Sequence, residues 1–151
     1  MNLEISVDDK GWRAVPGLRK LARTAVSAAL PDDDVAIGLL FTSDARIAEM
    51  NGEWRGKPKA TNVLSFPVSA AMPVPKGEPR PLGDIALAFG VIWREAQEQK
   101  KPLSHHVTHL IVHGVLHLLG YDHENDDEAG AMEAREIMIL AELGMENPYT
   151  P

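Results

Sequence analysis

The chain contains no cysteine among its 151 residues. It therefore has no disulfides and no thiolate ligands, so that any bound metal ion would need His, Asp or Glu. No apolar run reaches the ~18 residues that a membrane-spanning helix needs. Residues 1–10 also lack the charged start and apolar centre of a secretory signal. These absences argue against a disulfide-rich or membrane-spanning protein and favour a cytoplasmic location.

Positive charge is scarce as well, because 22 acidic residues outnumber 15 basic ones and give a net charge of −7. Such a balance argues against a general nucleic-acid binder, whose affinity comes largely from Lys and Arg. The bases nevertheless gather in two stretches, one with Arg13, Arg19, Lys20 and Arg23 and another with Arg55, Lys57 and Lys59. A solvated face is the ordinary explanation of such stretches, and a basic patch on an acidic protein is the alternative.

Hydrophobic periodicity predicts a mixture of strands and helices. Alternating apolar residues and short apolar runs indicate strands over residues 3–7, 35–41, 62–66 and 84–89. Apolar stripes at helical spacing indicate helices over 16–29, from 43 to a basic loop at 54–60, and over 91–100, 104–119 and 126–143. Ser104 is the expected cap of its helix, and the proline-rich stretch 67–83 is expected to be an exposed loop. We predict an α+β fold with one small mixed sheet of about four strands backed by helices, as a single domain over residues 1–151.

The segment from His113 to His123 carries the strongest functional signal. Residues four apart on a helix share a face, so His113 and His117 can aim two imidazoles at one point. Gly120 permits a positive φ, which lets the chain turn back so that His123 can reach the same point. Three neutral imidazoles form a tripod with a fourth coordination position free, an arrangement typical of a catalytic zinc site. We therefore predict one Zn²⁺, or another divalent transition metal, per chain, on this helix and the turn that follows.

The spacing His-x-x-x-His-x-x-Gly-x-x-His matches the metal frame of metzincin proteases. Those enzymes carry glutamate directly after the first histidine, as the general base of peptide hydrolysis. Here that position is Gly114, which cannot transfer a proton. The pattern keeps the metal frame without the peptidase base and so argues against a protease.

Three further residues near the tripod allow more than one interpretation. His106 and His109 lie further back on the same helix, and we interpret them as packing residues or as supports of the ligands. Asp122 directly precedes a ligand and can orient an imidazole, cap the last helix or face solvent.

The chain resembles the YbeY family of rRNA-maturation endoribonucleases, on motifs that extend beyond the histidines. The matching segments are His113-Gly-Val-Leu-His-Leu-Leu-Gly-Tyr-Asp-His123, then Asn51, Arg55 and Lys57 with Thr61-Asn-Val-Leu-Ser-Phe-Pro67, and Leu82-Gly-Asp-Ile85. Family members commonly have aspartate after the threonine of the second motif, whereas this chain has Asn62. A catalytic carboxylate would be lost by that difference, whereas a structural hydrogen bond would survive it more easily.

The resemblance implies a metal-dependent endoribonuclease, a hydrolase that prefers single-stranded RNA. It implies roles in maturing the 3′ end of 16S rRNA and in ribosome quality control. The implied partners are rRNA precursors and the small ribosomal subunit or its associated proteins. The family's metal ligands fall on His113, His117 and His123, and its functionally important arginine falls on Arg55.

Phosphodiester cleavage builds negative charge on the phosphoryl oxygens, and Arg55 can stabilise that charge by donating two parallel hydrogen bonds. His113 and Arg55 are therefore the expected catalytic residues. Lys57 and Lys59 would hold the RNA backbone, and Ser65 would hydrogen-bond the substrate or simply end its strand. Trp54 would stack on a base or, as the more ordinary interpretation, belong to the core or its rim.

Two other functions stay open. One is a ribosome-associated assembly factor whose metal is structural, for which the acid-rich region over residues 122–136 would suit a protein-binding face. The other is a metal-dependent hydrolase that acts on another substrate, such as a peptide, although Gly114 speaks against it.

Overall fold

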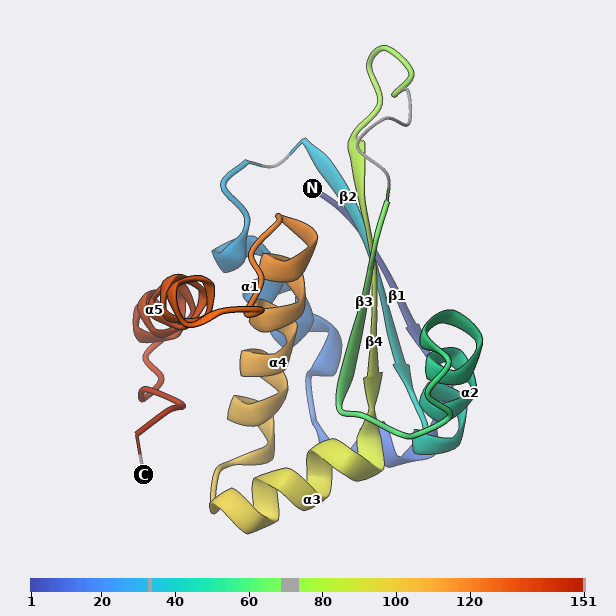
Figure 1. Ribbon diagram of the computed structural model, residues 1–151, viewed down its shortest axis with the longest axis vertical. Helices are drawn as coiled ribbons and strands as arrows, with labels where there is room; N and C mark the ends of the chain where they lie inside the picture. Colours follow the sequence, from blue (N-terminus) through green and yellow to red (C-terminus); the bar gives the residue numbers. More distant parts are fainter. Residues whose placement is uncertain (33, 69–73, 151) are drawn as a thin grey trace.

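A four-stranded sheet lies at the centre of the fold and carries helices on both faces (Figure 1). The computed structural model describes residues 1–32, 34–68 and 74–150. The strands are β1 (Asn2–Val7), β2 (Val35–Thr42), β3 (Val63–Pro67) and β4 (Arg80–Ala88). The helices are α1 (Leu18–Ala29), α2 (Asp44–Arg55), α3 (Phe89–Gln99), α4 (Leu103–Leu118) and α5 (Asp126–Glu142), with a short 3-10 helix, η1 (Lys10–Ala14), after β1. Within this described part of the chain, no helix is both long and apolar enough to cross a membrane.

The sheet is mixed, with the strand order β1-β2-β4-β3. The pairs β1–β2 and β2–β4 are parallel, whereas β3 runs antiparallel to β4 and forms one edge. Parallel neighbours need a crossover connection, and α1 supplies the one between β1 and β2. The predicted α+β fold with one small mixed sheet is confirmed.

The two faces of the sheet are covered unequally. α1 and α4 lie on one face with α5 packed outside them, and α2 lies on the other face (Figure 1). The main core lies between the sheet and the first group of helices, and a smaller cluster lies under α2. Within α4, Val107, Ile111 and Val115 are fully buried. These buried side chains fix the position of α4 against the rest of the core. The side chains on the opposite face of α4 are therefore held in place as well.

The end of α2 differs from the prediction. The sequence predicts a loop from Trp54, whereas the helix continues to Arg55. Gly56 then takes a φ of 68°, which lets its backbone N–H bond the carbonyls of Asn51 and Gly52 and close the helix. Trp54 and Arg55 therefore project from a helical turn, and Trp54 is exposed.

The loop predicted over residues 67–83 is shorter than expected. β4 begins at Arg80 instead of Asp84, and Leu82 is buried within it. The Arg80 N–H donates to the Asp34 carbonyl at 3.1 Å on the β2 side. Because successive residues of a strand alternate, the ring nitrogen of Pro81 faces the other side, and proline there removes no bond to β2. The prediction of a loop is wrong for Pro67, which ends β3, and for residues 80–83, and residues 69–73 lie outside the described residues.

The start of α4 also differs, because Ser104 is not its cap. Pro102 occupies the N-cap position, without a side-chain hydrogen bond to the helix. Ser104 lies inside the first turn, where its carbonyl accepts the Thr108 hydroxyl at 2.7 Å. Proline suits a helix start because the N–H that it lacks would have no helical partner there.

Helix α4 approaches β4 closely at Gly114. A side-chain carbon added there would lie 3.0 Å from two carbons of Ile85, Cδ1 and Cγ2. Ile85 is fully buried, so it has little space to retreat. The absence of a side chain at residue 114 therefore sets how near α4, and with it His113, lies to the sheet.

We expect Gly114→Ala to lower the free energy of unfolding by about 1–3 kcal/mol, the range for an overpacked core. The matched change Gly130→Ala, in the exposed middle of α5, adds a carbon that contacts nothing within 4 Å. It is expected to raise the free energy of unfolding by roughly 0.5–1 kcal/mol through helix propensity alone. Urea unfolding of both metal-free variants measures whether each change raises or lowers the free energy of unfolding. If both changes raised it, the close approach of α4 to β4 at Gly114 would be contradicted.

Candidate metal centre

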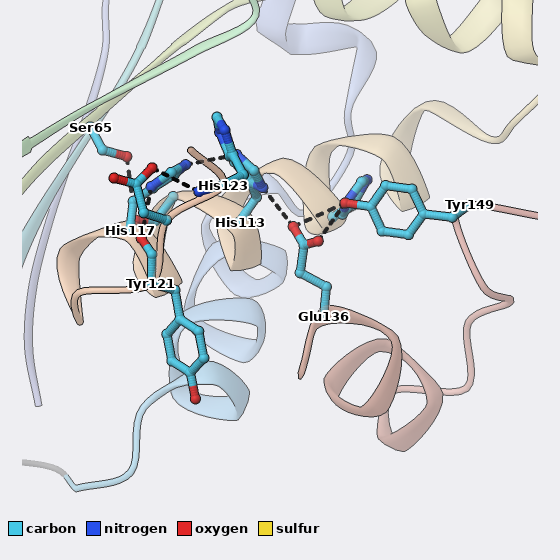
Figure 2. A network of polar contacts seen from close by, with 10 residues as sticks. Ser65, His113, His117, Tyr121, His123, Glu136 and Tyr149 are labelled. Carbon is cyan, nitrogen blue, oxygen red and sulfur yellow. Dashed lines mark hydrogen bonds and ion pairs between the residues drawn. The ribbon is translucent and has the colours of Figure 1, made fainter. Parts of the chain in front are cut away.

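Three histidines meet at the carboxyl end of α4. His113 and His117 lie one turn apart on that helix, and His123 follows the turn at Gly120. The chain turns there because Gly120 has a φ of 106° and its N–H bonds the His117 carbonyl at 3.0 Å. Each histidine offers one ring nitrogen to a group of three that lie within 4.8 Å of one another (Figure 2). The structure thus brings the three predicted ligands together.

Each of the two helical histidines is anchored through its Nδ1 atom. His113 Nδ1 lies 2.6 Å from a carboxylate oxygen of Glu136, and His117 Nδ1 lies 3.1 Å from the backbone carbonyl of Tyr121. An ionised carboxylate and a carbonyl only accept hydrogen bonds, so each Nδ1 carries a proton, and in the neutral form of each ring the lone pair is then on Nε2. Burial, followed by the neighbouring His113 and His123, lowers the pKa of His117 and so keeps its ring neutral.

The two Nε2 atoms lie 3.1 Å apart, which suits a shared metal ion. When both rings are neutral with this tautomer, their lone pairs repel each other at that distance unless a cation lies between them. Bonds of ~2.0–2.1 Å to a tetrahedral Zn²⁺ would hold such nitrogens ~3.3 Å apart. The ring of His123 closes the third side, with its centroid 4.9 Å from that of His117 and 5.7 Å from that of His113. The donor set and its geometry therefore fit one zinc-like ion.

A cleft of about 600 Å³ opens onto the three histidines. Opposite α4, it is lined by side chains of the edge strand β3, among them Ser65, and by Arg55 from the end of α2. Arg55 is exposed, so its guanidinium is free to meet a bound molecule. The fold therefore joins three segments that are distant in the sequence into one site.

The residues predicted to bind substrate are divided between the cleft and its surroundings. Ser65 lines the cleft, where its hydroxyl donates to the Gly114 carbonyl at 3.3 Å. Lys57 and Lys59 lie in the exposed segment after α2, outside the described lining of the cleft. The Asn51 side chain ties this segment to α2 by donating to the Lys59 carbonyl at 2.9 Å. The structure therefore brings Arg55 and Ser65 to the cleft, but not the two lysines.

Asn62, at the edge of the cleft, makes structural hydrogen bonds. Its side-chain amide donates to the two carboxylate oxygens of Glu95 at 3.0 and 3.3 Å, and its oxygen accepts the Val63 N–H at 2.7 Å. The buried His106 contacts the same carboxylate through Nε2, at 3.0 Å. Aspartate at residue 62 would put a second negative charge beside Glu95, which asparagine avoids. Asn62 thus links the residue before β3 to α3 through hydrogen bonds.

His109 and Asp122 support their neighbours instead of completing the tripod. His109 Nε2 lies 3.4 Å from the Glu136 carboxylate. Asp122 accepts the backbone N–H of His123 at 2.8 Å, which steadies the turn that carries this histidine. The cap of α5 is Asn125, so Asp122 does not fill that role.

Glu136 is a site residue that the motifs do not reveal. It lies on α5, far along the chain from its partner His113, and it is fully buried. The sequence does contain a signal, because Met132, Glu136, Ile139 and Leu140 form the buried stripe of α5. A carboxylate on the apolar stripe of a helix needs a buried partner.

Comparison with known proteins assigns this chain to a family. The family model described as "Endoribonuclease YbeY" matches residues 6–144. The chain belongs to the endoribonuclease YbeY family. The endoribonuclease YbeY of Azorhizobium caulinodans is 47% identical over 99% of this chain and 96% of that protein. That of Bradyrhizobium diazoefficiens is 48% identical over 97% of this chain and 84% of that protein. The predicted resemblance to YbeY endoribonucleases is thereby confirmed.

A solved structure supports the fold of this YbeY family member. The solution structure of TM1509 from Thermotoga maritima matches it with a TM-score of 0.56 and covers 99% of both chains. The sequence identity is 21%, so the likeness concerns the fold alone. It is a likeness of the whole α+β arrangement, because so much of both chains takes part.

The buried His106 couples the stability of the fold to pH. Burial lowers the pKa of His106 below its ordinary value of 6.5, although the bond to Glu95 raises it. The unfolded chain then binds a proton at this residue more readily than the folded chain does. The stability contributed by the neutral ring is therefore complete above pH 6.5 and declines as the pH falls below that value.

We expect metal-free wild-type protein to lose more free energy of unfolding than His106→Gln does when the pH is lowered from neutral to mildly acidic. The glutamine amide can keep the hydrogen bond to Glu95 but does not titrate. His105→Gln, at the exposed neighbouring position, is the matched control and should keep the wild-type slope. Urea unfolding across this pH range measures the slopes, and equal slopes for wild type and His106→Gln would refute the coupling.

Proposed function

We propose that this YbeY family member is a metal-dependent endoribonuclease that prefers single-stranded RNA. The observation that carries the proposal is a single cleft whose lining includes three clustered histidines and the exposed Arg55. Hydrolysis of a phosphodiester needs a group that activates water and a cation that stabilises the negative charge developing on the phosphoryl oxygens. The cleft holds residues suited to both tasks.

The proposed ligands of one Zn²⁺, or of another divalent transition metal, are His113, His117 and His123. When bound, such an ion supplies Lewis acidity and lowers the pKa of a bound water toward ~7. Glu136 and the Tyr121 carbonyl hold the protons of His113 and His117 on Nδ1, which keeps both Nε2 atoms available. His113 is thus the proposed catalytic histidine through its contact with the ion.

Arg55 is the proposed partner of the scissile phosphate. Its guanidinium stays protonated at physiological pH and can donate two parallel hydrogen bonds to phosphoryl oxygens. Ser65 is proposed to contact the substrate within the cleft, because its present bond to the Gly114 carbonyl is long, at 3.3 Å. Lys57 and Lys59 would hold backbone phosphates beyond the cleft, as point charges on the exposed segment after α2.

A peptide substrate is disfavoured by the packing at Gly114. A glutamate there, where metzincin proteases carry their general base, would meet Ile85 with its first side-chain carbon already at 3.0 Å. The site therefore lacks room for the peptidase base at the position where that chemistry needs it.

We further propose rRNA precursors as the substrates, with maturation of the 3′ end of 16S rRNA and ribosome quality control as the processes. Relatives named endoribonuclease YbeY, at 47% and 48% identity, support RNA as the substrate class. The small ribosomal subunit or its associated proteins are the proposed partners, and the cytoplasm is the proposed location. Residues 1–151 would act there as one metallo-endoribonuclease domain.

We expect untagged protein loaded with Zn²⁺ to cleave single-stranded RNA and to stop when the metal is chelated. His113→Ala should abolish cleavage. Arg55→Ala should lower kcat by roughly 10²–10³-fold, the usual effect of removing one donor that stabilises developing charge. Arg46→Ala is the matched control, because Arg46 lies on the same helix and pairs with Glu49 at the surface. End-labelled RNA on denaturing gels measures the rates.

Two outcomes would count against this proposal. Wild-type activity in a folded Arg55→Ala protein would remove Arg55 from the mechanism. RNA left intact by zinc-loaded wild-type protein, with a melting temperature that falls on chelation, would contradict the endoribonuclease and favour an assembly factor with a structural metal.

We expect elemental analysis of untagged protein to find one equivalent of a divalent transition metal, and far less in His117→Ala. Removal of one imidazole leaves two ligands, too few for a stable tripod. His105→Ala, which removes an exposed histidine from the same helix, is the matched control and should keep the wild-type content. Full metal content in His117→Ala would mean that the ion is held elsewhere.

A further inference from the structure

Behind the three histidines, the carboxylate of Glu136 is surrounded by hydrogen-bonding groups. Oε1 lies 2.6 Å from His113 Nδ1 and 3.4 Å from His109 Nε2. Oε2 accepts the hydroxyl hydrogen of Tyr149. Figure 2 shows Glu136 between His113 and Tyr149, on the side of His113 that faces away from the other two histidines. Because the side chain is fully buried and both oxygens have partners, its position is fixed.

The surroundings keep this carboxylate ionised although it is buried. Burial alone raises its pKa, but hydrogen bonds from His109, His113 and Tyr149 outweigh burial and lower the pKa of Glu136 to about 2. Burial, and then the bond to Glu136, raises the pKa of Tyr149, so its hydroxyl remains a donor. The 2.6 Å contact between Oε1 and Nδ1 is itself a hydrogen bond, and it holds the proton of the neutral His113 ring on Nδ1.

Tyr149 reaches Glu136 from the segment that follows α5. This segment is tied to the α3–α4 junction by Lys101, whose Nζ donates to the Pro148 carbonyl at 3.0 Å. The Tyr149 N–H donates to the Asn147 side-chain oxygen at 2.8 Å, which fixes the backbone next to the tyrosine. The hydroxyl of Tyr149 is thereby held where the second oxygen of Glu136 needs a donor.

On the basis of the metal site proposed above, we propose that Glu136 and Tyr149 are positioning residues that set the affinity of that site for its ion. Glu136 holds the ring of His113 with Nε2 toward the cleft, and Tyr149 holds Glu136 within hydrogen-bond distance of His113. The segment after α5 thereby belongs to the metal site although it contributes no ligand.

The physical reason lies in what His113 could do without its carboxylate. The ring would be able to rotate or to carry its proton on Nε2, and either change lowers the fraction of molecules ready to bind an ion. The basicity of Nε2 would fall as well. Outer partners of this kind typically change metal affinity 10- to 100-fold. Tyr149 acts through Glu136, so its removal should have the smaller effect.

The test is the Zn²⁺ dissociation constant of the full chain, measured by competition with a chromophoric chelator. Glu136→Gln should bind Zn²⁺ roughly 10–100-fold more weakly than wild type, and Tyr149→Phe should fall between the two. Glu133→Gln, which removes an exposed carboxylate one turn earlier on α5, is the matched control and should keep wild-type affinity. The visible spectrum of Co²⁺-loaded protein should change in Glu136→Gln and stay as in wild type in Glu133→Gln.

Wild-type Zn²⁺ affinity and Co²⁺ spectra in both folded variants would overturn the positioning role, even if the metal-free variants melt at lower temperature. If Glu136→Gln does not fold, Tyr149→Phe still tests the positioning role. This change removes only a hydroxyl from a half-exposed side chain, so the variant is expected to fold. His113→Ala separates this inference from the proposed function. If Zn²⁺ binding were lost in His113→Ala but unchanged in Glu136→Gln and Tyr149→Phe, the proposed metal site would stand and only the positioning role would be refuted. Zn²⁺ binding that survives in His113→Ala would overturn both.

Discussion

Two imidazole Nε2 atoms held 3.1 Å apart are the constraint on which the site depends. When both rings are neutral their lone pairs repel each other, and the pair persists because each ring is held from behind. α5 brings Glu136 to His113, and the turn after α4 brings the Tyr121 carbonyl to His117. The rings cannot relieve their repulsion by rotating without losing these bonds. A cation relieves it without any rotation, which is what preorganisation means for a metal site.

The packing that holds these rings also limits the chemistry that they can serve. α4 lies so close to β4 that a side-chain carbon at residue 114 would crowd the buried Ile85. A carboxylate base beside the first of the three histidines is therefore disfavoured. Arg55 instead enters the cleft from α2, on the other side of β3, and brings a positive charge. A site built in this way suits an anionic substrate better than a peptide.

The grouping of the three histidines could be predicted because its signal is local, whereas the groups that hold two of them could not. His113, His117 and Gly120 need only a helix and a turn to fix their geometry. Glu136 contacts His113 through the packing of two helices, which no spacing rule expresses. The resemblance points to Arg55 but not to its place on α2, because Gly56, two residues beyond Trp54, decides where the helix ends. The sequence does not reveal the start of β4, because Pro81 suggests a loop although its ring nitrogen faces away from β2.

The net charge of −7 constrains how RNA would approach such a site. The net charge supplies no general attraction for RNA, so binding as proposed would rely on a few cations near the cleft, namely Arg55 and the lysines that follow it. Asp122 and Glu124 line the same cleft and repel phosphate from the side of the turn after α4. A strand would then lie nearer to α2 and β3 than to that turn. Few RNA phosphates would be neutralised, so the affinity for RNA would depend only weakly on salt concentration. The preference for single-stranded RNA would then come from how well a flexible single strand fits between β3 and α4.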